Sequence, residues 1–499
     1  MKKFHYCIVL LALSTMLSCS TRELDENTSL CSSNSSPTKA VILDSSFTSE
    51  FDFSVQEKDI WAFVERQKGF PQIISIEPRL RGKDTLLFVA HLEKGWRVFS
   101  ADKHLPPVVA EIPEGFFNQQ ALENPGLRGW MESIMDLTCE LKQEKELSSA
   151  TDYTDLWEGY QVSKKEGKPA IKGLSQEPTW TRVILSQQTT FDVTPYGPLL
   201  LTKWGQRNPW NISLPLYQGT QRHPTGCAAV AISQLLYYYH NTISSLSGLY
   251  QNITITDWQY HTGNPPYYTS TLSRINYQDP SSLWAQMPKD STEYSINYPA
   301  SLVGASYVSD LMVDVGNRAS IHYFADGSGS GTNVPSELPA LTSFGLSYSH
   351  GSFDVTTAYA EIVNSRPILL NGFDSIHYSP EVGHAWVIDG VTRYRYITYT
   401  TYQWLMGYHV GSLPNGEEMT FAQAQEAAWS IGLDKPEDGM ITYETSYTEP
   451  YYKFHMNWGW NGESDGLYYY NDLVLHNGHY YQLTSNQSMT YGFHASALN

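Results

Sequence analysis

The chain is poor in basic residues and has no long apolar run after its N-terminal segment. Lys and Arg number 32 against 51 Asp and Glu, so the formal net charge is −19. A protein that binds nucleic acid needs a basic face to neutralise phosphates, and this charge argues against nucleic acid as a partner. No later stretch approaches the roughly 18 consecutive apolar residues of a membrane-spanning helix. No internal repeat of useful period is present either.

Aromatic residues, in contrast, are abundant. They make up 13% of the chain, with 35 Tyr and 14 Trp, and hydrophobic residues as a whole make up 41%. This composition favours a folded, sheet-rich protein over a disordered one. At 499 residues the chain is long enough for about two or three folded units.

The N-terminal residues have the pattern of a bacterial lipoprotein signal. Lys2 and Lys3 precede an apolar run from Ile8 to Leu13, and small residues then lead to Cys19. Cleavage before Cys19 would remove a signal peptide of residues 1–18. Acylation of Cys19 would then anchor the protein by lipid to a membrane of the bacterial envelope, periplasmic or surface-exposed, with release on maturation possible. The alternative is a plain secretory signal with an incidental cysteine.

The few cysteines leave one thiol to explain. Of the five, Cys7 lies in the signal and Cys19 would carry lipid, so Cys31, Cys139 and Cys227 remain. No disulfide framework is evident from their spacing. Cys227 stands alone in the chain beyond residue 190, which makes it a candidate for a reactive group.

Composition divides the chain behind the signal into four segments. Residues 19–45 are rich in Ser, Thr, Asn and acidic residues and predict a flexible tether. Residues 46–147 predict a small α+β unit with its own apolar content. Residues 148–192 are largely polar and irregular, and predict an exposed linker that holds the processing sites. Residues 193–499 form the largest segment, rich in aromatic residues and punctuated by glycine.

Periodicity places the main elements within these segments. In the small unit we expect two helices and two strands, at Ile60–Val64, Leu127–Leu141, Thr85–Ala90 and Trp96–Ser100. In the largest segment we expect many short strands and a few helices, at Cys227–Tyr239, Ala300–Val315 and Thr420–Ile431. The Gly/Ser-rich loop at 325–332 is a weak candidate for a phosphate cradle, because no Lys-Ser/Thr pair completes a P-loop.

Cys227 lies where a helix is expected to begin. Gly226 precedes it, and Ala228, Ala231 and Leu235 would share one helical face. The unpaired N–H groups and the positive dipole end of a helix N-terminus stabilise a thiolate, the nucleophilic form of cysteine. The alternative is that Cys227 is a small buried hydrophobic residue.

A thiol nucleophile needs a base, a group that orients the base and donors for an oxyanion, and the chain offers candidates for all three. His384 stands at the head of an expected strand, directly after Gly383. The amide of Asn457 or a neighbouring indole could orient its imidazole. Gln206, in a turn-prone loop upstream of Cys227, could supply the oxyanion donor beside the Cys227 N–H. Taken singly, each could instead be a structural or surface residue.

Several separated motifs occur in one order along the chain. They are Trp204-Gly205-Gln206 with Asn208-Pro209, Thr225-Gly226-Cys227, Asp310–Gly316, the Gly/Ser-rich loop, Gly383-His384-Ala385 with Val387–Gly390, and Asn457–Trp460. In this order the chain resembles the streptopain family of cysteine peptidases. Upstream, Trp96–Lys103 and Asn124–Trp130 resemble the inhibitory prosegment of that family's zymogens.

The resemblance implies an α+β, papain-like, two-lobed fold over residues 193–499, preceded by an inhibitory prodomain at 46–147. It implies that Cys227 is the nucleophile, His384 the general acid/base and Gln206 the oxyanion donor. The turn from Asn457 to Trp460 would support the imidazole, through Asn457 or through an indole. By the same resemblance, Ser330 and Gly383 would line the substrate cleft, Ser330 on an alignment shifted by one residue. No metal or cofactor is expected.

The chain departs from the family pattern between its His and its Asn. His384 and Asn457 are 73 positions apart, roughly fifty more than the expected hairpin connection, and long insertions are usually functional or mobile. The insertion spans about 393–448. The lipid anchor is a second departure, relative to freely secreted members.

We therefore expect an exported, lipid-anchored cysteine endopeptidase that is made as a latent zymogen and acts on protein or peptide substrates. Two alternatives concern the large segment: a cell-wall amidase or transpeptidase with the same dyad, and a non-catalytic surface-binding lipoprotein on a peptidase scaffold. A third is that the N-terminal unit inhibits other proteins in trans.

Overall fold

The computed structural model describes residues 17–18, 53–143, 153–158, 180–217, 219–243, 251–276, 281–374, 382–406, 416–470, 473–474, 480–481 and 487–495. The signal before residue 17, the tether 19–45 with Cys19 and Cys31, and the linker residues 148–152 and 159–179 lie outside them.

The chain folds into two compact units. The first comprises Met1–Tyr153, Tyr196–Val391 and Lys453–Asn499, and the second comprises Thr154–Pro195 and Thr392–Tyr452.

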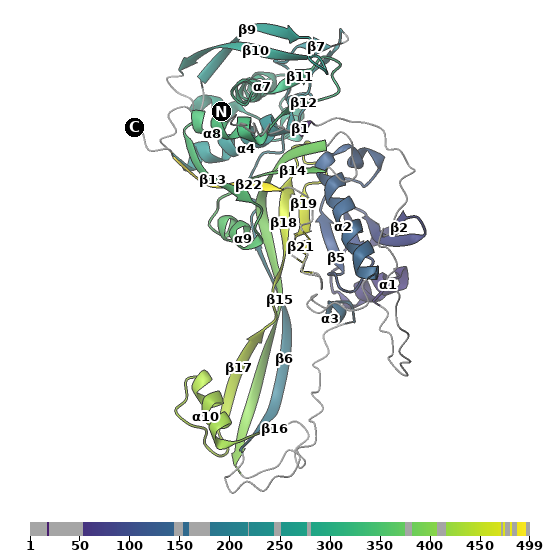
Figure 1. Ribbon diagram of the computed structural model, residues 1–499, viewed down its shortest axis with the longest axis vertical. Coiled ribbons are helices and arrows are strands. Elements are labelled where there is room, and N and C mark those ends of the chain that lie inside the picture. Colours follow the sequence, from purple (N-terminus) through teal and green to yellow (C-terminus); the bar gives the residue numbers. More distant parts are fainter. Residues whose placement is uncertain are drawn as a thin grey trace, which may run out of the picture. The chain divides into compact units, whose positions relative to one another are not determined.

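The first unit begins with the predicted small α+β segment, coloured purple to blue in Figure 1. Its elements are α1 (Glu57–Arg66), β2 (Ile73–Arg81), β3 (Asp84–Leu92), β4 (Trp96–Ser100), β5 (Val108–Ile112), a 3₁₀ helix (Gln119–Glu123) and α2 (Pro125–Gln143). The strands β2 to β5 pair in chain order as an antiparallel meander. The two helices and two strands expected here are confirmed, with boundaries that differ by a few residues.

The helix α2 shows why this segment holds together. Five apolar residues at alternating spacings of three and four are each at most 3% exposed, namely Leu127, Trp130, Ile134, Leu137 and Leu141. They form one stripe, and α2 packs against β3. The side chain of Asn124 accepts hydrogen bonds from the N–H groups of Gly126 (3.0 Å) and Leu127 (3.3 Å), which caps the first turn.

The middle of the chain forms a helical part of the first unit, with one antiparallel sheet. The helices are α4 (Cys227–Thr242), α5 (Ser281–Gln286), α6 (Ser291–Ile296), α7 (Ser301–Arg318), α8 (Val334–Ser343) and α9 (Val355–Val363). The sheet has the order β1-β12-β11-β10-β9, from β1 (Leu17–Ser18), β12 (Ser330–Thr332), β11 (His322–Phe324), β10 (Tyr267–Asn276) and β9 (Gln251–His261). A small hairpin joins β7 (Leu216–Tyr217) to β8 (Gln221–Arg222).

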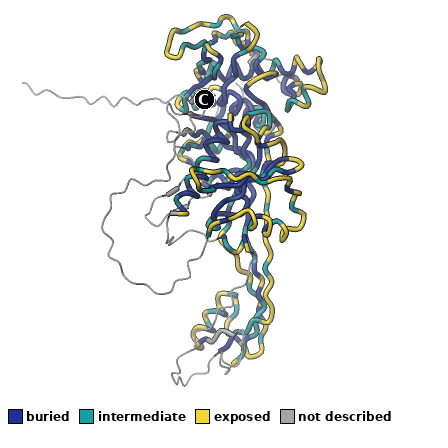
Figure 2. Tube along the Cα trace, turned by 90° about the vertical axis from the view of Figure 1, so that its right-hand side faces the viewer, coloured by how far each residue is buried: buried dark blue, intermediate teal, exposed yellow. Residues whose placement is uncertain are grey.

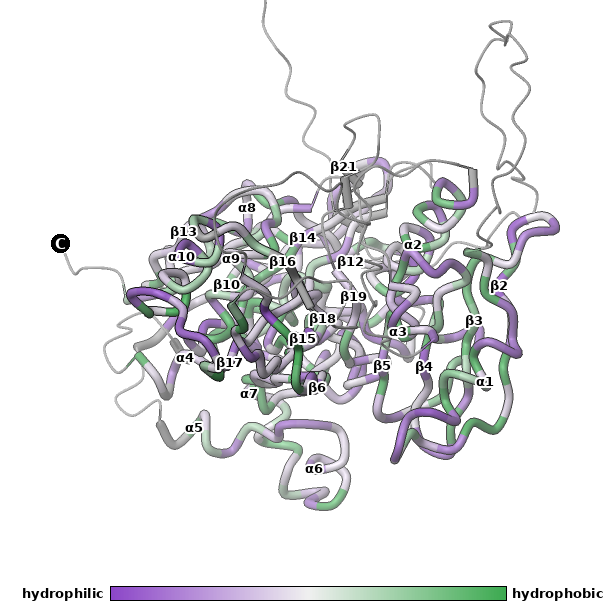
Figure 3. The backbone as a smooth tube through the Cα atoms, turned by 90° about the horizontal axis from the view of Figure 1, so that it is seen from below, coloured by the Kyte–Doolittle hydropathy of each residue, from purple (hydrophilic) through white to green (hydrophobic). Residues whose placement is uncertain are grey.

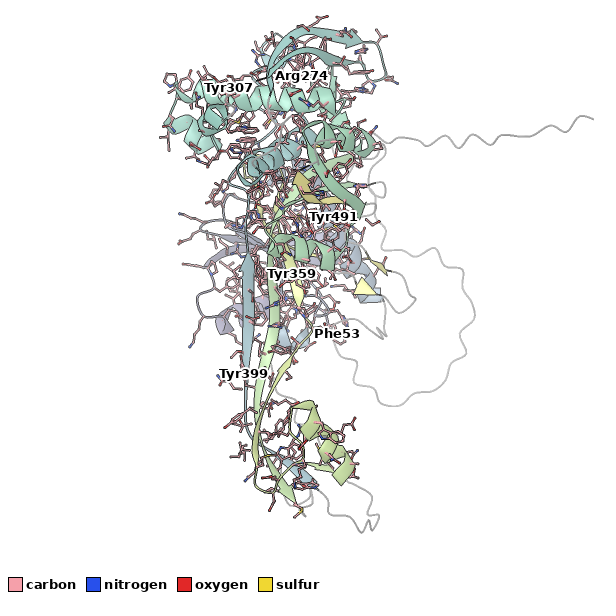
Figure 4. The ribbon with its side chains drawn as sticks, turned by 90° about the vertical axis from the view of Figure 1, so that its left-hand side faces the viewer. Phe53, Arg274, Tyr307, Tyr359, Tyr399 and Tyr491 are labelled. Carbon is pink, nitrogen blue, oxygen red and sulfur yellow. The ribbon has the colours of Figure 1, made fainter. Side chains whose placement is uncertain are left out.

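Two of these helices, α4 and α7, are the predicted ones. They pack on each other in the main core, and α4 also contacts β12. Arg274, labelled in Figure 4, fixes α7 to β10 because its Nε donates to Asp314 Oδ1 at 2.8 Å. The helices α5, α6, α8 and α9 were not predicted. They are short, and α8 contains Pro339 in its interior, a residue that removes a helical hydrogen bond and obscures the pattern.

A second, larger sheet carries the C-terminal part of the first unit. Its order is β13-β22-β14-β15-β18-β19-β5-β4-β3-β2. The strands not yet bounded are β13 (Leu346–Ser352), β22 (Ser488–Ala495), β14 (Ile368–Asp374), β15 (Val382–Met406), β18 (Tyr451–Asn457) and β19 (Gly466–Tyr470), and a separate pair joins β20 (Leu473–Val474) to β21 (Tyr480–Tyr481). The N-terminal meander therefore continues this sheet, because β5 pairs antiparallel with β19. The predicted α+β class is confirmed.

In its described residues, the second unit consists of a β-ribbon and two helices. Its elements are α3 (Thr154–Glu158), β6 (Trp180–Tyr196), the distal part of β15, β16 (Gly416–Met419), α10 (Phe421–Ser430) and β17 (Ile441–Tyr447). β6 pairs with β15 and β16, and β17 pairs with β15. Its small core contains Trp180, Trp404, Met419 and Ala424. Figure 2 shows mostly exposed and intermediate residues along this ribbon, against a largely buried interior in the first unit.

Two predictions fall on this second unit. The helix expected at Thr420–Ile431 is confirmed as α10. The expectation that residues 148–192 are irregular is wrong for the part from Trp180 onward, which belongs to the 17-residue strand β6. Val, Ile and Thr recur along this strand, and such β-branched residues suit a pleated surface even where polar neighbours suggest a loop.

Apolar and hydrophilic stretches alternate along the chain in Figure 3. Among the described residues, no helix is both long enough and apolar enough to cross a membrane.

Candidate active site

Cys227 is the first residue of α4, as expected from the sequence. Its side chain is 2% exposed. Gly226 before it has φ 93°, a conformation that L side chains rarely adopt, and a Cβ there would lie 3.4 Å from the Cβ of Ser330. Glycine is thus needed to deliver the thiol to the helix N-terminus, where unpaired N–H groups and the dipole favour a thiolate.

Cys227 is also the free cysteine of the described residues. Cys139 on α2 is disulfide-bonded, a constraint that the cysteine spacing did not reveal. The core that surrounds Cys227 includes Ala385 and Val387 of β15, the two strand residues that flank Trp386. The nucleophile candidate and the strand of the base candidate therefore share one core.

His384 lies near the start of β15, directly opposite Gly372 of β14, and is 2% exposed. Its Nε2 lies 3.0 Å from the carbonyl oxygen of Trp458. A carbonyl can only accept, so Nε2 carries the proton, and Nδ1 of the neutral ring is left as the acceptor. The ring stacks on Trp386 with centroids 5.8 Å apart and lies 6.2 Å from the Trp458 ring. The geometry thus makes Nδ1 the atom that could take a thiol proton.

The turn after β18 supports the imidazole through its backbone. Asn457, 3% exposed, makes hydrogen bonds to Gln234, to Thr202 and to the N–H of Gly459. The group that hydrogen-bonds His384 Nε2 is the Trp458 carbonyl. Trp460 lies on the same turn, where its carbonyl accepts from the N–H of Glu463 at 3.0 Å. The catalytic roles predicted for Asn457 and Trp460 stay predictions.

Gln206 is buried, at 8% exposed, in the loop that leads toward the thiol. Its carbonyl accepts a hydrogen bond from the N–H of Thr225 at 2.9 Å, two residues before Cys227. The loop is fixed further by Trp204, whose indole N–H donates to the carbonyl of Pro288 at 2.7 Å. This anchoring brings the Gln206 backbone to the segment that enters α4, which suits the predicted role of oxyanion donor.

The two predicted substrate-cleft residues lie on different sheets. Ser330 begins β12 and is fully buried, and its hydroxyl donates to the carbonyl of Pro224 at 2.6 Å. Gly383 pairs with Phe373 across β14 and β15, one residue before His384. Both positions adjoin the segments that carry Cys227 and His384, and their contact with substrate stays a prediction.

The first turn of α2 lies against the imidazole. A Cβ added to Gly126 would lie 2.4 Å from the Trp458 ring and 2.7 Å from Cδ2 of His384. Farther along α2, the indole N–H of Trp130 donates to the carbonyl of Tyr469 at 3.2 Å. The N-terminal segment therefore occupies the space in front of the candidate base.

A partly buried ion pair joins the N-terminal segment to β18. Lys453 of β18, 2% exposed, is paired with Glu111 of β5. Burial lowers the pKa of Lys453 below its ordinary value, and the charge of Glu111 opposes that fall. The N-terminal segment thus supplies a counter-ion to Lys453.

Ionisable groups also lie behind the turn. His455 Nδ1 lies 2.6 Å from Asp389, and Asp465 Oδ1 accepts the N–H of Trp458 at 2.9 Å. Burial works to lower the pKa of His455, but the charge and hydrogen bond of Asp389 raise it above its ordinary value. Burial raises the pKa of Asp465 to about 7. No group of three or more His, Cys, Asp or Glu in the described part of the chain could hold a metal ion.

Comparison with known proteins shows the family of this chain. Residues 204–469 match the model of the Peptidase C10 family. The chain belongs to the Peptidase C10 family. The prediction of a streptopain-type chain is thereby confirmed, and the matched range contains Gln206, Cys227, His384 and the turn at Asn457–Trp460.

Relatives of this C10 member include two streptopains of Streptococcus pyogenes. The streptopain of serotype M1 is 23% identical over 321 residues, which cover 59% of this chain and 65% of that protein. A second S. pyogenes streptopain is 22% identical over 323 residues, with the same coverage. The chain therefore matches slightly less than two thirds of the length of these relatives.

Two solved structures are also similar to this C10 chain. A fragment of Prevotella intermedia prointerpain A has 20% sequence identity and a TM-score of 0.46, and covers 85% of this chain and 100% of the fragment. The active wild-type interpain A of the same organism has 22% identity and a TM-score of 0.36, and covers 59% of this chain and 94% of its own.

Sequence reasoning missed two contributors to this site. One is the Trp458 carbonyl, because a backbone group has no residue-type signature. The other is Gln234, which hydrogen-bonds both Trp204 and Asn457. A signal for Gln234 was present, since it is a polar residue within an otherwise apolar stretch of the expected helix.

Proposed function

We propose that this chain is a cysteine endopeptidase, exported and made as a latent zymogen, that hydrolyses peptide bonds through a Cys227 thioester. The observation that carries the proposal is the arrangement of its two reacting groups. Cys227 is held at a helix N-terminus, and His384 is held through Nε2 by the Trp458 carbonyl, so that Nδ1 is the ring atom that would take the thiol proton. Membership of the C10 family supports the same chemistry.

The proposed reaction begins when Cys227 gives its proton to His384 Nδ1. The thiolate sulfur attacks the substrate carbonyl carbon, and the Cys227 N–H with the Gln206 side chain stabilises the oxyanion. The C–N bond then breaks while His384 returns the proton to the leaving amine. Water, deprotonated by Nδ1, attacks the thioester, so that the C–S bond breaks, the acid leaves and the thiol is restored.

Latency follows from the position of the N-terminal segment. Gly126 contacts His384 and Trp458, and β5 completes the sheet at β19. A substrate cannot occupy the space that this segment fills, so removal of the segment would be required for turnover. The segment is thus proposed to be an intramolecular inhibitor.

Export and lipid anchoring at Cys19 belong to the same proposal and rest on the N-terminal sequence alone. They place the protein in the bacterial envelope, in the periplasm or at the surface, with its substrates among proteins or peptides found there.

The test compares the full chain with Cys227→Ala after limited proteolysis of the linker. We expect the wild type to cleave a casein-type substrate and the variant to lose activity by at least about a thousandfold, because the nucleophile is gone. Thermal unfolding of both proteins is the control for folding. A processed Cys227→Ala protein that retains wild-type turnover would end the proposal, as would a wild type that hydrolyses cell-wall peptides but no protein. Absence of label on the chain in cells fed a palmitate analogue would end the anchoring part.

A further inference from the structure

The side-chain amide of Gln234 joins the helix of Cys227 to two other parts of the site. Gln234 lies on α4, seven residues after Cys227, and is fully buried. Its Oε1 accepts the N–H of Trp204 at 3.1 Å, and its Nε2 donates to Asn457 Oδ1 at 2.9 Å. One side chain thus bonds both the loop that leads to Gln206 and the turn that leads to Trp458.

Asn457 extends this connection to the imidazole. Its Oδ1 also accepts the N–H of Gly459 at 3.3 Å, and its Nδ2 donates to the carbonyl of Thr202 at 2.8 Å. The N–H of Gly459 and the C=O of Trp458 belong to the same planar peptide group. That C=O accepts the hydrogen bond from His384 Nε2. Asn457 therefore acts on His384 through one peptide plane, without touching the ring.

Backbone groups fix the orientation of both amides. Trp204 N–H and Gly459 N–H can only donate, and the Thr202 carbonyl can only accept, so neither amide can flip without losing bonds. Both residues are at most 3% exposed. In such a buried network, a lost partner leaves a desolvated polar group unsatisfied.

We infer that Gln234 is a positioning residue, which holds the Gln206 loop and the His384 support in register with the helix that carries Cys227. The inference rests on the proposed function, since it assigns a role in that reaction. Ser233, the neighbouring residue, shows that burial of a polar side chain on α4 is not enough. Its hydroxyl is buried as well, but has no hydrogen-bond partner among the described residues.

The first test is Gln234→Glu in the full chain, activated by limited proteolysis. A protonated carboxyl can copy both bonds, because its O–H donates to Asn457 and its C=O accepts from Trp204. The ionised form has no donor and sets an oxygen against Asn457 Oδ1. Burial raises the pKa of such a carboxyl, so the change of form falls near neutral pH.

We expect kcat/KM of this variant, per active site titrated with an epoxide thiol trap, to stay within about threefold of the wild type at about pH 5. At about pH 8.5 it should fall at least about tenfold below the wild type. Normalisation to titrated sites removes any effect of a lower folded fraction. A purely structural role would change the number of sites but leave the shape of the profile unaltered.

The matched control is Ser233→Ala, which we expect to follow the wild-type profile throughout. If Gln234→Glu follows the wild type at both pH values, or if Ser233→Ala shows the same loss, the inference is overturned. A wild type that is inactive in the same assay instead refutes the proposed function, so the two failures are distinguishable.

A second variant, Asn457→Asp, tests the network from the other side, including the case where Gln234→Glu does not fold. The protonated carboxyl donates to the Thr202 carbonyl, and the ionised form cannot. The same direction is expected, with activity retained in acid and lost by at least about tenfold as pH rises. A flat ratio to the wild type across this range would contradict the inference.

Discussion

At the scale of single residues, Asp465 is an ionisable group behind the Asn457–Trp460 turn whose ionisation costs the folded protein free energy. Asp465 is 7% exposed and accepts the N–H of Trp458 at 2.9 Å. Burial raises its pKa to about 7, Asp389 adds to the rise, and the charges of His455 and Lys203 oppose it. The folded protein thus retains a proton on Asp465 that the unfolded chain releases near its ordinary pKa of 3.8.

This difference predicts how Asp465→Asn affects stability with pH. The contribution of the protonated Asp465 carboxyl to the free energy of unfolding is fully present below about pH 4 and is lost as pH rises through about 7. The amide is neutral at every pH and keeps an oxygen for the Trp458 N–H. We therefore expect the free energy of unfolding of the variant, relative to that of the wild type, to increase by a few kcal/mol between pH 4 and 8.

Urea unfolding at a series of pH values measures this gain. Asp257→Asn, an exposed change on β9, serves as the control for simple loss of a charge. A difference between Asp465→Asn and wild type that stays constant with pH would show that Asp465 ionises at its ordinary pKa.

Sequence alone predicted the residues whose type defines the chemistry, and it missed those that act through the backbone. Cys227 and His384 can be named as candidates from the sequence because a thiol after glycine and an imidazole at the head of a strand are visible in the residue types. The Trp458 carbonyl cannot, since every residue has one. Whether Asn457 or an indole supports His384 could not be decided from sequence, because the answer depends on which peptide plane faces the ring.

At the scale of elements, the N-terminal segment is an extension of the fold that it covers. Its β5 pairs with β19, and its helix α2 sets Gly126 against His384 and Trp458. The helix was predicted because its apolar stripe repeats with helical period. Its docking was not predicted from periodicity, because contact between segments more than 250 positions apart leaves no local pattern.

The close fit at Gly126 predicts that Gly126→Ala weakens latency. The new Cβ would lie 2.4 Å from the Trp458 ring, so the first turn of α2 must shift. Strain of this kind costs about 1–3 kcal/mol, enough to raise exposure of the site about tenfold. We expect alkylation of Cys227 by iodoacetamide in the unprocessed chain to be faster by that factor, measured by mass spectrometry.

Gly129→Ala is the matched control for this change. It lies on the same helix, and a Cβ there meets nothing within 4 Å. Alanine favours a helix at both positions, so loss of helicity cannot explain a difference. Equal alkylation rates for Gly126→Ala and wild type would mean that this contact does not govern access.

At the scale of the whole molecule, the insertion and the supposed linker combine into a unit of their own. The strand β6 comes from the linker, and β16, α10 and β17 come from the insertion. The linker supplies one core residue, Trp180, and the insertion supplies Trp404, Met419 and Ala424, so the sequence of the linker alone gives little sign of a buried strand. Together they enclose Trp404, whose indole N–H donates to Thr442 at 2.9 Å. Large residues elsewhere on the ribbon are exposed, such as Tyr399, labelled in Figure 4, at 48%.

Because this core is small, Trp404→Ala should unfold the second unit and leave the first unit folded. Trp404 is fully buried and is one of the four core residues, and a Trp-to-Ala change in a core costs about 3–5 kcal/mol. A unit this small has little stability beyond that amount. We expect calorimetry to show loss of one transition, with rapid proteolysis within residues 392–452, and persistence of the transition of the first unit.

The control is Tyr443→Ala, at a residue 78% exposed, which should change neither transition. Loss of both transitions in Trp404→Ala would show that the two units fold as one, and that the insertion is part of the framework on which the Cys227 site depends.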